Sequence, residues 1–89
     1  MVYIELEPDL EACVETKAKR LYQQYLSKLF NKSDEQKLGE KLEILRLFLE
    51  STNFSKLRRE SEKHLVEGRR VKFIVRSEKG KPEYEMQII

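Results

Sequence analysis

The chain has 89 residues, of which 39% are apolar and 38% charged, and its formal net charge is +2. A chain of this length buries only about 60–65% of its unfolded surface, so we expect residues 1–89 to form one small globular domain with a thin core. The sequence has no apolar run of membrane-spanning length, and residues 1–5 lack the layout of a signal peptide. We therefore expect a cytoplasmic protein that contacts no membrane.

Few residues could supply metal or phosphate chemistry. Cys13 is the only cysteine and His64 the only histidine, so an internal disulfide and a cysteine-based metal cage are excluded. The three glycines are isolated and form no phosphate-binding loop. We expect neither a metal nor a cofactor. Cys13 is interpreted as a small buried hydrophobe and His64 as a histidine packed in the core or at its edge.

The first half of the chain predicts a short strand and two helices. Alternation over residues 2–6 is typical of a half-buried strand, although a frayed tail would show the same pattern. Apolar residues at three- and four-residue steps then predict a helix from Pro8 to about Phe30. A capping box at Ser33–Gln36 precedes the second helix, and Gly39 inside that helix indicates the close approach of another backbone.

The second half predicts a helix and a β-hairpin. Asn53 is a helix N-cap, and Gly68 is the glycine expected after the helix end. Two alternating segments then flank a two-residue turn at Lys79-Gly80, which sets the pairing of the strands. In that register the apolar pairs are Val75 with Tyr84, Phe73 with Met86, and Val71 with Ile88.

These elements define the expected fold class. It is α+β, in the order β-α-α-α-β-β, with three helices packed on a small antiparallel sheet. The sheet consists of the C-terminal hairpin, and the strand at residues 2–6 is either its third member or a tail. The apolar side chains of the hairpin are expected to face the helices.

Basic residues are concentrated in one part of the chain. Residues 54–81 hold 10 basic and 4 acidic side chains, whereas residues 1–53 hold 8 and 10. In the helix most cations have an acid four residues away, but the hairpin cations have fewer acidic neighbours. This favours a non-catalytic module that binds nucleic acid through phosphate contacts. The predicted contact residues are Arg59, Arg69, Arg70, Lys72, Lys79 and Lys81. The alternative is that these cations only protect exposed strands from aggregation.

A second hypothesis is a module for protein–protein interaction or homodimerisation, built on the pair formed by the first two helices. Four apolar residues lie outside the best single stripe of their helices. They are Leu26, Phe30, Ile44 and Leu47. Such a second stripe commonly receives a partner. The alternative is that the sheet and the third helix cover both sides of the pair.

No catalytic motif is present, so we do not expect an enzyme. One enzymatic alternative is a metal-independent ribonuclease that lacks a conventional triad. Its residues would be His64, Arg69, Arg70, Lys72 and Tyr84.

Overall fold

The computed structural model describes residues 2–30 and 37–89 and confirms the expected fold class. The elements are β1 (Ile4–Leu6), α1 (Val14–Phe30), α2 (Leu38–Ser51), α3 (Phe54–Leu65), β2 (Val71–Glu78) and β3 (Lys81–Ile88). The predicted capping box at Ser33–Gln36 lies outside the described residues. None of the helices in the described part has the length and apolar character that a membrane crossing requires.

The three strands form one antiparallel sheet in the order β1-β2-β3. The hairpin register is the predicted one, with Val75 opposite Tyr84 and Glu78 opposite Lys81. Lys79 and Gly80 both have positive φ angles, 53° and 79°, as a primed two-residue turn requires. Residues 4–6 pair with β2, so the N-terminal segment is a strand of the sheet and not a tail.

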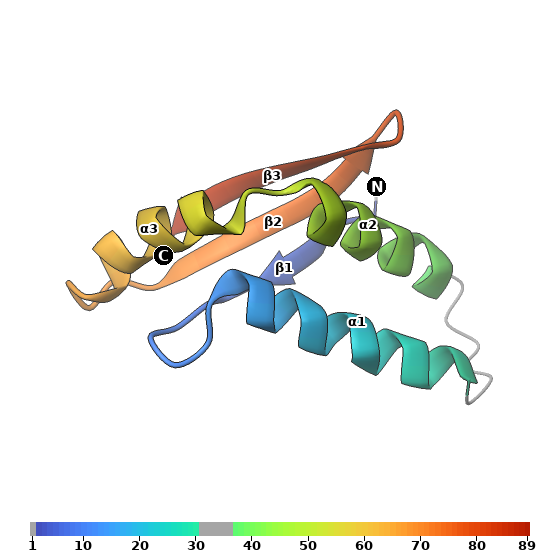
Figure 1. The fold of residues 1–89 in the computed structure, drawn as a ribbon, viewed down its shortest axis with the longest axis horizontal. Helices are drawn as coiled ribbons and strands as arrows, with labels where there is room; N and C mark the ends of the chain where they lie inside the picture. The colour runs from blue at the N-terminus through green and yellow to red at the C-terminus, as the bar shows by residue number, and fades with distance from the viewer. Residues whose placement is uncertain (1, 31–36) are drawn as a thin grey trace.

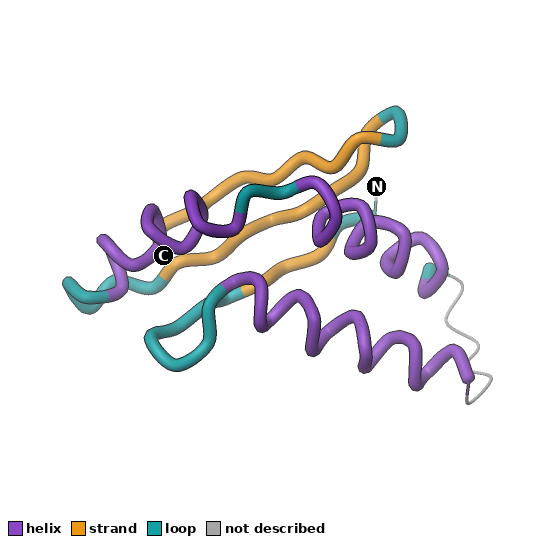
Figure 2. The backbone as a smooth tube through the Cα atoms, in the orientation of Figure 1, coloured by secondary structure: helices purple, strands orange, loops and turns teal. Residues whose placement is uncertain are grey.

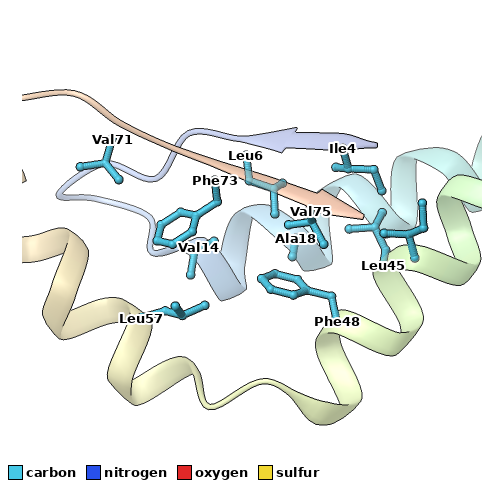
Figure 3. Close-up of a cluster of buried hydrophobic side chains, with 11 residues drawn as sticks. Ile4, Leu6, Val14, Ala18, Leu45, Phe48, Leu57, Val71, Phe73 and Val75 are labelled. Carbon is cyan, nitrogen blue, oxygen red and sulfur yellow. The ribbon is translucent and has the colours of Figure 1, made fainter. Parts of the chain in front are cut away.

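All three helices lie on the same face of the sheet, which gives a two-layer fold (Figures 1 and 2). The core lies between the layers (Figure 3). Its fully buried members include Val14, Ala18, Leu45, Phe48, Leu57, Val71, Phe73 and Val75. The apolar residues of β2 are thus covered as predicted. On β3, however, Tyr84 and Ile88 remain 41% and 45% exposed, because the helix layer covers the edge strand only partly.

Helix α1 begins later than predicted. Instead of starting at Pro8, the chain makes a turn in which the Asp9 carboxylate accepts hydrogen bonds from the backbone N–H groups of Glu11 and Ala12, at 2.9 and 2.7 Å. An aspartate that bonds its own downstream backbone competes with helix formation. These bonds also lower the pKa of Asp9. Leu10, which falls inside the predicted helix, is exposed in this turn.

Both ends of α3 agree with the sequence. The Asn53 side chain accepts a hydrogen bond from the backbone N–H of Lys56 at 3.3 Å, which caps the first turn. At the other end Gly68 has a φ of 82°, and the backbone N–H of Arg69 donates to the His64 carbonyl at 3.0 Å. This geometry closes the helix and directs the chain into β2.

Gly39 is not a site of close packing. It lies in the first turn of α2, and a Cβ added there would meet no atom of residues 2–30 or 37–89 within 4 Å. We therefore expect Gly39→Ala to stabilise the protein by about 0.5–1 kcal/mol, because alanine restricts the unfolded chain more than glycine does. Gly80→Ala should instead destabilise it by about 1–2 kcal/mol, since its φ is +79°. Urea unfolding of both variants tests this pair; destabilisation by Gly39→Ala would restore the packing interpretation.

Candidate interaction surface

Three of the predicted phosphate-binding cations are paired with carboxylates. Arg69 lies 2.8 Å from Glu67, Arg70 lies 2.9 Å from Glu7, and Lys72 lies 3.7 Å from Glu5. The expectation that the hairpin cations have few acidic neighbours is therefore wrong for these three residues. For Arg70 and Lys72 the reason is the position of β1, which places Glu5 and Glu7 beside β2 on the outer face of the sheet. The partner of Arg69 is Glu67, which is close to it along the chain.

The other three cations do not form one surface. Within residues 2–30 and 37–89, Arg59, Lys79 and Lys81 have no ion pair. Arg59 belongs to α3, whereas Lys79 lies in the hairpin turn, and Figure 1 shows these two segments at opposite ends of the molecule. A phosphate backbone would thus meet isolated cations between acid-paired ones.

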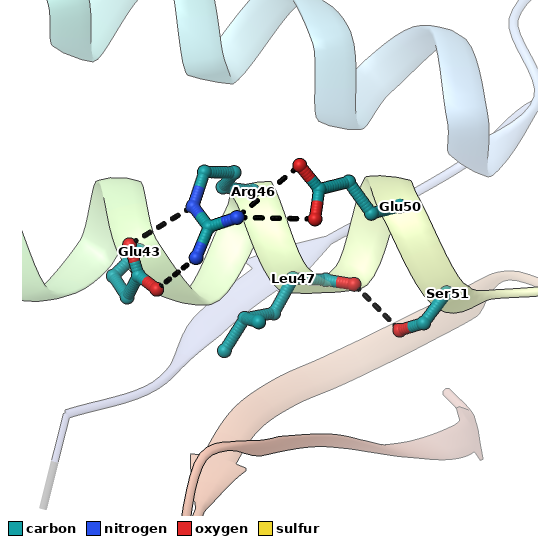
Figure 4. A network of polar contacts seen from close by, with 5 residues as sticks. All are labelled: Glu43, Arg46, Leu47, Glu50 and Ser51. Carbon is teal, nitrogen blue, oxygen red and sulfur yellow. Dashed lines mark hydrogen bonds and ion pairs between the residues drawn. The ribbon is translucent and has the colours of Figure 1, made fainter.

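Charges on α2 also pair with one another. The Arg46 guanidinium forms a fork between Glu43 and Glu50, with Arg46 Nε 3.1 Å from Glu43 Oε2 and Nη1 3.0 Å from Glu50 Oε2 (Figure 4). The hydrogen bonds from Arg46 lower the pKa of Glu43. Because the fork is exposed, its effect on stability is small. With two carboxylates and one guanidinium the fork is net acidic, so it gives α2 no basic face for a phosphate.

The predicted helical interface is also not assembled. Ile44 is only 5% exposed and belongs to the hydrophobic core, so its assignment to an interface is wrong. Leu26 and Leu47 are half-buried, and only Phe30 is largely exposed, at 81%. Helix α2 packs on α1 and also on β2 and β3, so a wide apolar arc is covered from two sides within the fold.

The residues of the ribonuclease hypothesis do not converge. Lys72 lies on the outer face of the sheet beside Glu5, whereas the Tyr84 ring packs on the inner face against Phe73, with ring centroids 6.2 Å apart. Elsewhere, His64 Nδ1 lies 3.0 Å from an Arg69 guanidinium nitrogen. These side chains are split between the two faces and cannot act as one site.

The surroundings of Cys13 are more polar than the sequence indicated. It precedes α1, where its carbonyl accepts from the Lys17 N–H at 3.0 Å, and its Sγ lies 3.4 Å from the Thr16 hydroxyl. The hydrogen bond with Thr16, with smaller contributions from the Thr16 and Glu15 backbone and from Arg58, lowers the pKa of the Cys13 thiol. The thiol is partly accessible and lines a shallow cavity. In the sequence, Asp9 four residues upstream indicates a turn before Cys13. The prediction of a helix from Pro8 onward hid this signal.

This geometry gives a pH-dependent prediction. Because the pKa of Cys13 is lowered in the fold, the thiolate should form at a lower pH in the native protein than in urea, where an ordinary value near 8.5 applies. Iodoacetamide alkylation measured against pH should show a lower midpoint for the native protein. Thr16→Val should move this midpoint upward, whereas Thr16→Ser, which keeps the hydroxyl, is the matched control and should not. Equal midpoints in the native protein and in urea would contradict the prediction.

The most exposed part of the sheet is the free edge of β3. Among the described residues this strand pairs only with β2, and it borders the sheet over its full length, as Figure 1 shows. In a two-residue hairpin the residues that flank the turn form a hydrogen-bonded pair, and such pairs then alternate along the ladder. The 2.9 Å bond from the Ile89 N–H to the Arg70 carbonyl fits this alternation.

It follows that alternate backbone groups of β3 point away from β2. These belong to Pro82, Tyr84, Met86 and Ile88, whose side chains lie on the inner, helix-facing side of the sheet. Proline has no N–H, so the donors of the edge are those of Tyr84, Met86 and Ile88. We call these three residues, with their outward backbone groups, the β3 edge. The β3 edge combines unpaired peptide groups with half-exposed apolar side chains.

The fold and this surface define a small α+β protein whose sheet has one short edge strand and one long one. A match covering residues 1–87 places the chain in an uncharacterised protein family, and the chain belongs to that family. It is similar to a protein of Archaeoglobus fulgidus that is described as uncharacterized, with 42% identity over 50 residues. The match covers 53% of the chain and 59% of that relative. No solved structure matches the chain.

Proposed function

We propose that the protein is a non-catalytic protein-interaction module that forms a homodimer through the β3 edge. The observation that carries this proposal is the free edge of an eight-residue strand next to half-exposed Tyr84 and Ile88. Proteins commonly blunt such edges, because unpaired strand groups recruit another strand. Here Pro82 removes a backbone donor only at the beginning of the strand. The segment from Tyr84 to Ile88 keeps its donors, its acceptors and its apolar side chains.

Nucleic-acid binding is the competing proposal, and its basis in the fold is weaker. Phosphate affinity grows with the number of cations whose counterions are released. Glu5, Glu7 and Glu67 already neutralise half of the six predicted contact residues. Arg59 on α3, and Lys79 and Lys81 at the opposite end of the molecule, are the predicted contact residues that would remain for this function.

Sedimentation separates the two proposals. The purified protein is run over a range of concentrations, alone and with labelled single- and double-stranded oligonucleotides, at low and high salt. A dimer through the β3 edge should form with rising protein concentration, tolerate salt and leave the oligonucleotides unshifted. An oligonucleotide shift that high salt reverses, in a protein that stays monomeric, would reject the homodimer and support phosphate binding.

A further inference from the structure

We infer that the two copies pair as antiparallel β3 strands in one particular register, centred on Met86, to form a continuous six-stranded sheet. This inference rests on the proposed homodimer and specifies its geometry. In such a pairing the outward groups of one β3 edge must meet those of the other. Residues directly opposite each other also present their side chains on the same face of the sheet.

Charges on the outer face exclude most registers. Glu83 and Glu85 project there, and like charges directly opposite each other are destabilising. A two-fold axis at Glu83 or at Glu85 would place that carboxylate against its own copy. An axis at Tyr84 would place Glu83 of each copy opposite Glu85 of the other copy. These three registers are therefore unfavourable.

An axis at Met86 avoids every such contact. It places Tyr84 opposite Ile88 of the second copy and Met86 opposite its own copy, so all donors of the β3 edge find acceptors. On the inner face the half-exposed Tyr84 and Ile88 side chains become neighbours. On the outer face Glu85 meets Gln87, a carboxylate beside an amide that can donate to it. An axis at Gln87 would leave the Tyr84 position outside the paired strands.

In this register the paired segment is also the part of β3 that is least protected against pairing with another strand. Glu83 already has a partner in Arg76, at 3.6 Å, whereas Glu85 has no ion pair within the described residues. Pro82 and the Lys79-Gly80 turn lie at the other end of the strand, away from the axis. Both helix layers would then lie on one side of the joined sheet, because an antiparallel pair keeps side-chain faces together.

Cysteine cross-linking tests the register. In a Cys13→Ser background, Met86→Cys should form a disulfide with its own copy, because opposite residues of a hydrogen-bonded pair lie about 5.5 Å apart between Cα atoms. Glu85→Cys is the matched control, since its copy would lie diagonally at about 7–8 Å. Tyr84→Cys and Ile88→Cys should cross-link when mixed but not separately. Urea unfolding of each reduced variant verifies that it is folded.

The outcomes distinguish the register from the dimer itself. Faster cross-linking of Met86→Cys than of Glu85→Cys, with the mixed pair also reacting, supports the register. The reverse order, or no cross-link in a protein that sediments as a dimer, overturns the register while the homodimer stands. A Cys13→Ser protein that sediments as a monomer at all concentrations overturns both.

Discussion

Replacing Phe48 by alanine is expected to reduce the free energy of unfolding by about 3–5 kcal/mol. Phe48 is fully buried and meets the Phe54 ring edge-on, with centroids 5.2 Å apart, and the Tyr84 ring at 6.1 Å. It therefore joins α2 to α3 and to β3. Figure 3 shows its ring among the buried side chains of the core. A chain of this size has a total stability of roughly 4–13 kcal/mol, so the expected loss is a large fraction of it.

Phe30 provides the matched control, because it is the same residue type and is 81% exposed. Phe30→Ala should change the free energy of unfolding by no more than about 0.5 kcal/mol. The two variants and the parent are compared by their midpoints of urea unfolding. The comparison holds if the free energy of unfolding falls with urea at the same slope in all three proteins. Equal losses from both substitutions would mean that the core is not centred on Phe48.

The second large effect is expected from Met86→Pro, which should abolish self-association while the fold persists. The Met86 N–H points away from β2, and proline is tolerated at such positions of an edge strand. The substitution removes the donor at the centre of the proposed dimer and places a ring against the opposing strand. We expect the dissociation constant of the dimer to rise by at least about tenfold, which corresponds to 1.4 kcal/mol.

Sedimentation and circular dichroism together test this variant. Met86→Leu is the control, because it retains the N–H and a similar side-chain volume. Met86→Leu should dimerise like the parent protein, and Met86→Pro should stay monomeric with the spectrum of a folded chain. A folded Met86→Pro variant that still dimerises would exclude the β3 edge as the interface.

Most of the fold could be predicted from local patterns. The Lys79-Gly80 turn determined the register of the hairpin, and Asn53 and Gly68 determined the bounds of α3, because each acts through its immediate neighbours. The start of α1 was missed because the Asp9 carboxylate bonds the backbone of its own turn. Helical periodicity does not reveal that competition.

The surface was harder to predict because it depends on contacts between distant segments. The charge of Arg70 and Lys72 looked uncompensated until β1 was placed beside β2, which brings Glu7 and Glu5 to them from the opposite end of the chain. Ile44 likewise appeared surplus on a single helix and is buried by its neighbours. The β3 edge was visible in the sequence only as the apolar alternation of a strand, which does not show which strand lies at the border of a sheet.

Hydrogen exchange of the unmodified protein, followed by NMR at each amide, tests the β3 edge dimer most directly. The amides of Glu83, Glu85 and Gln87 face β2 and should be protected at every protein concentration. The amides of Tyr84, Met86 and Ile88 should exchange fast in dilute protein and become protected as the concentration rises. If these three amides exchange equally fast at low and high concentration, the β3 edge does not pair with a second copy.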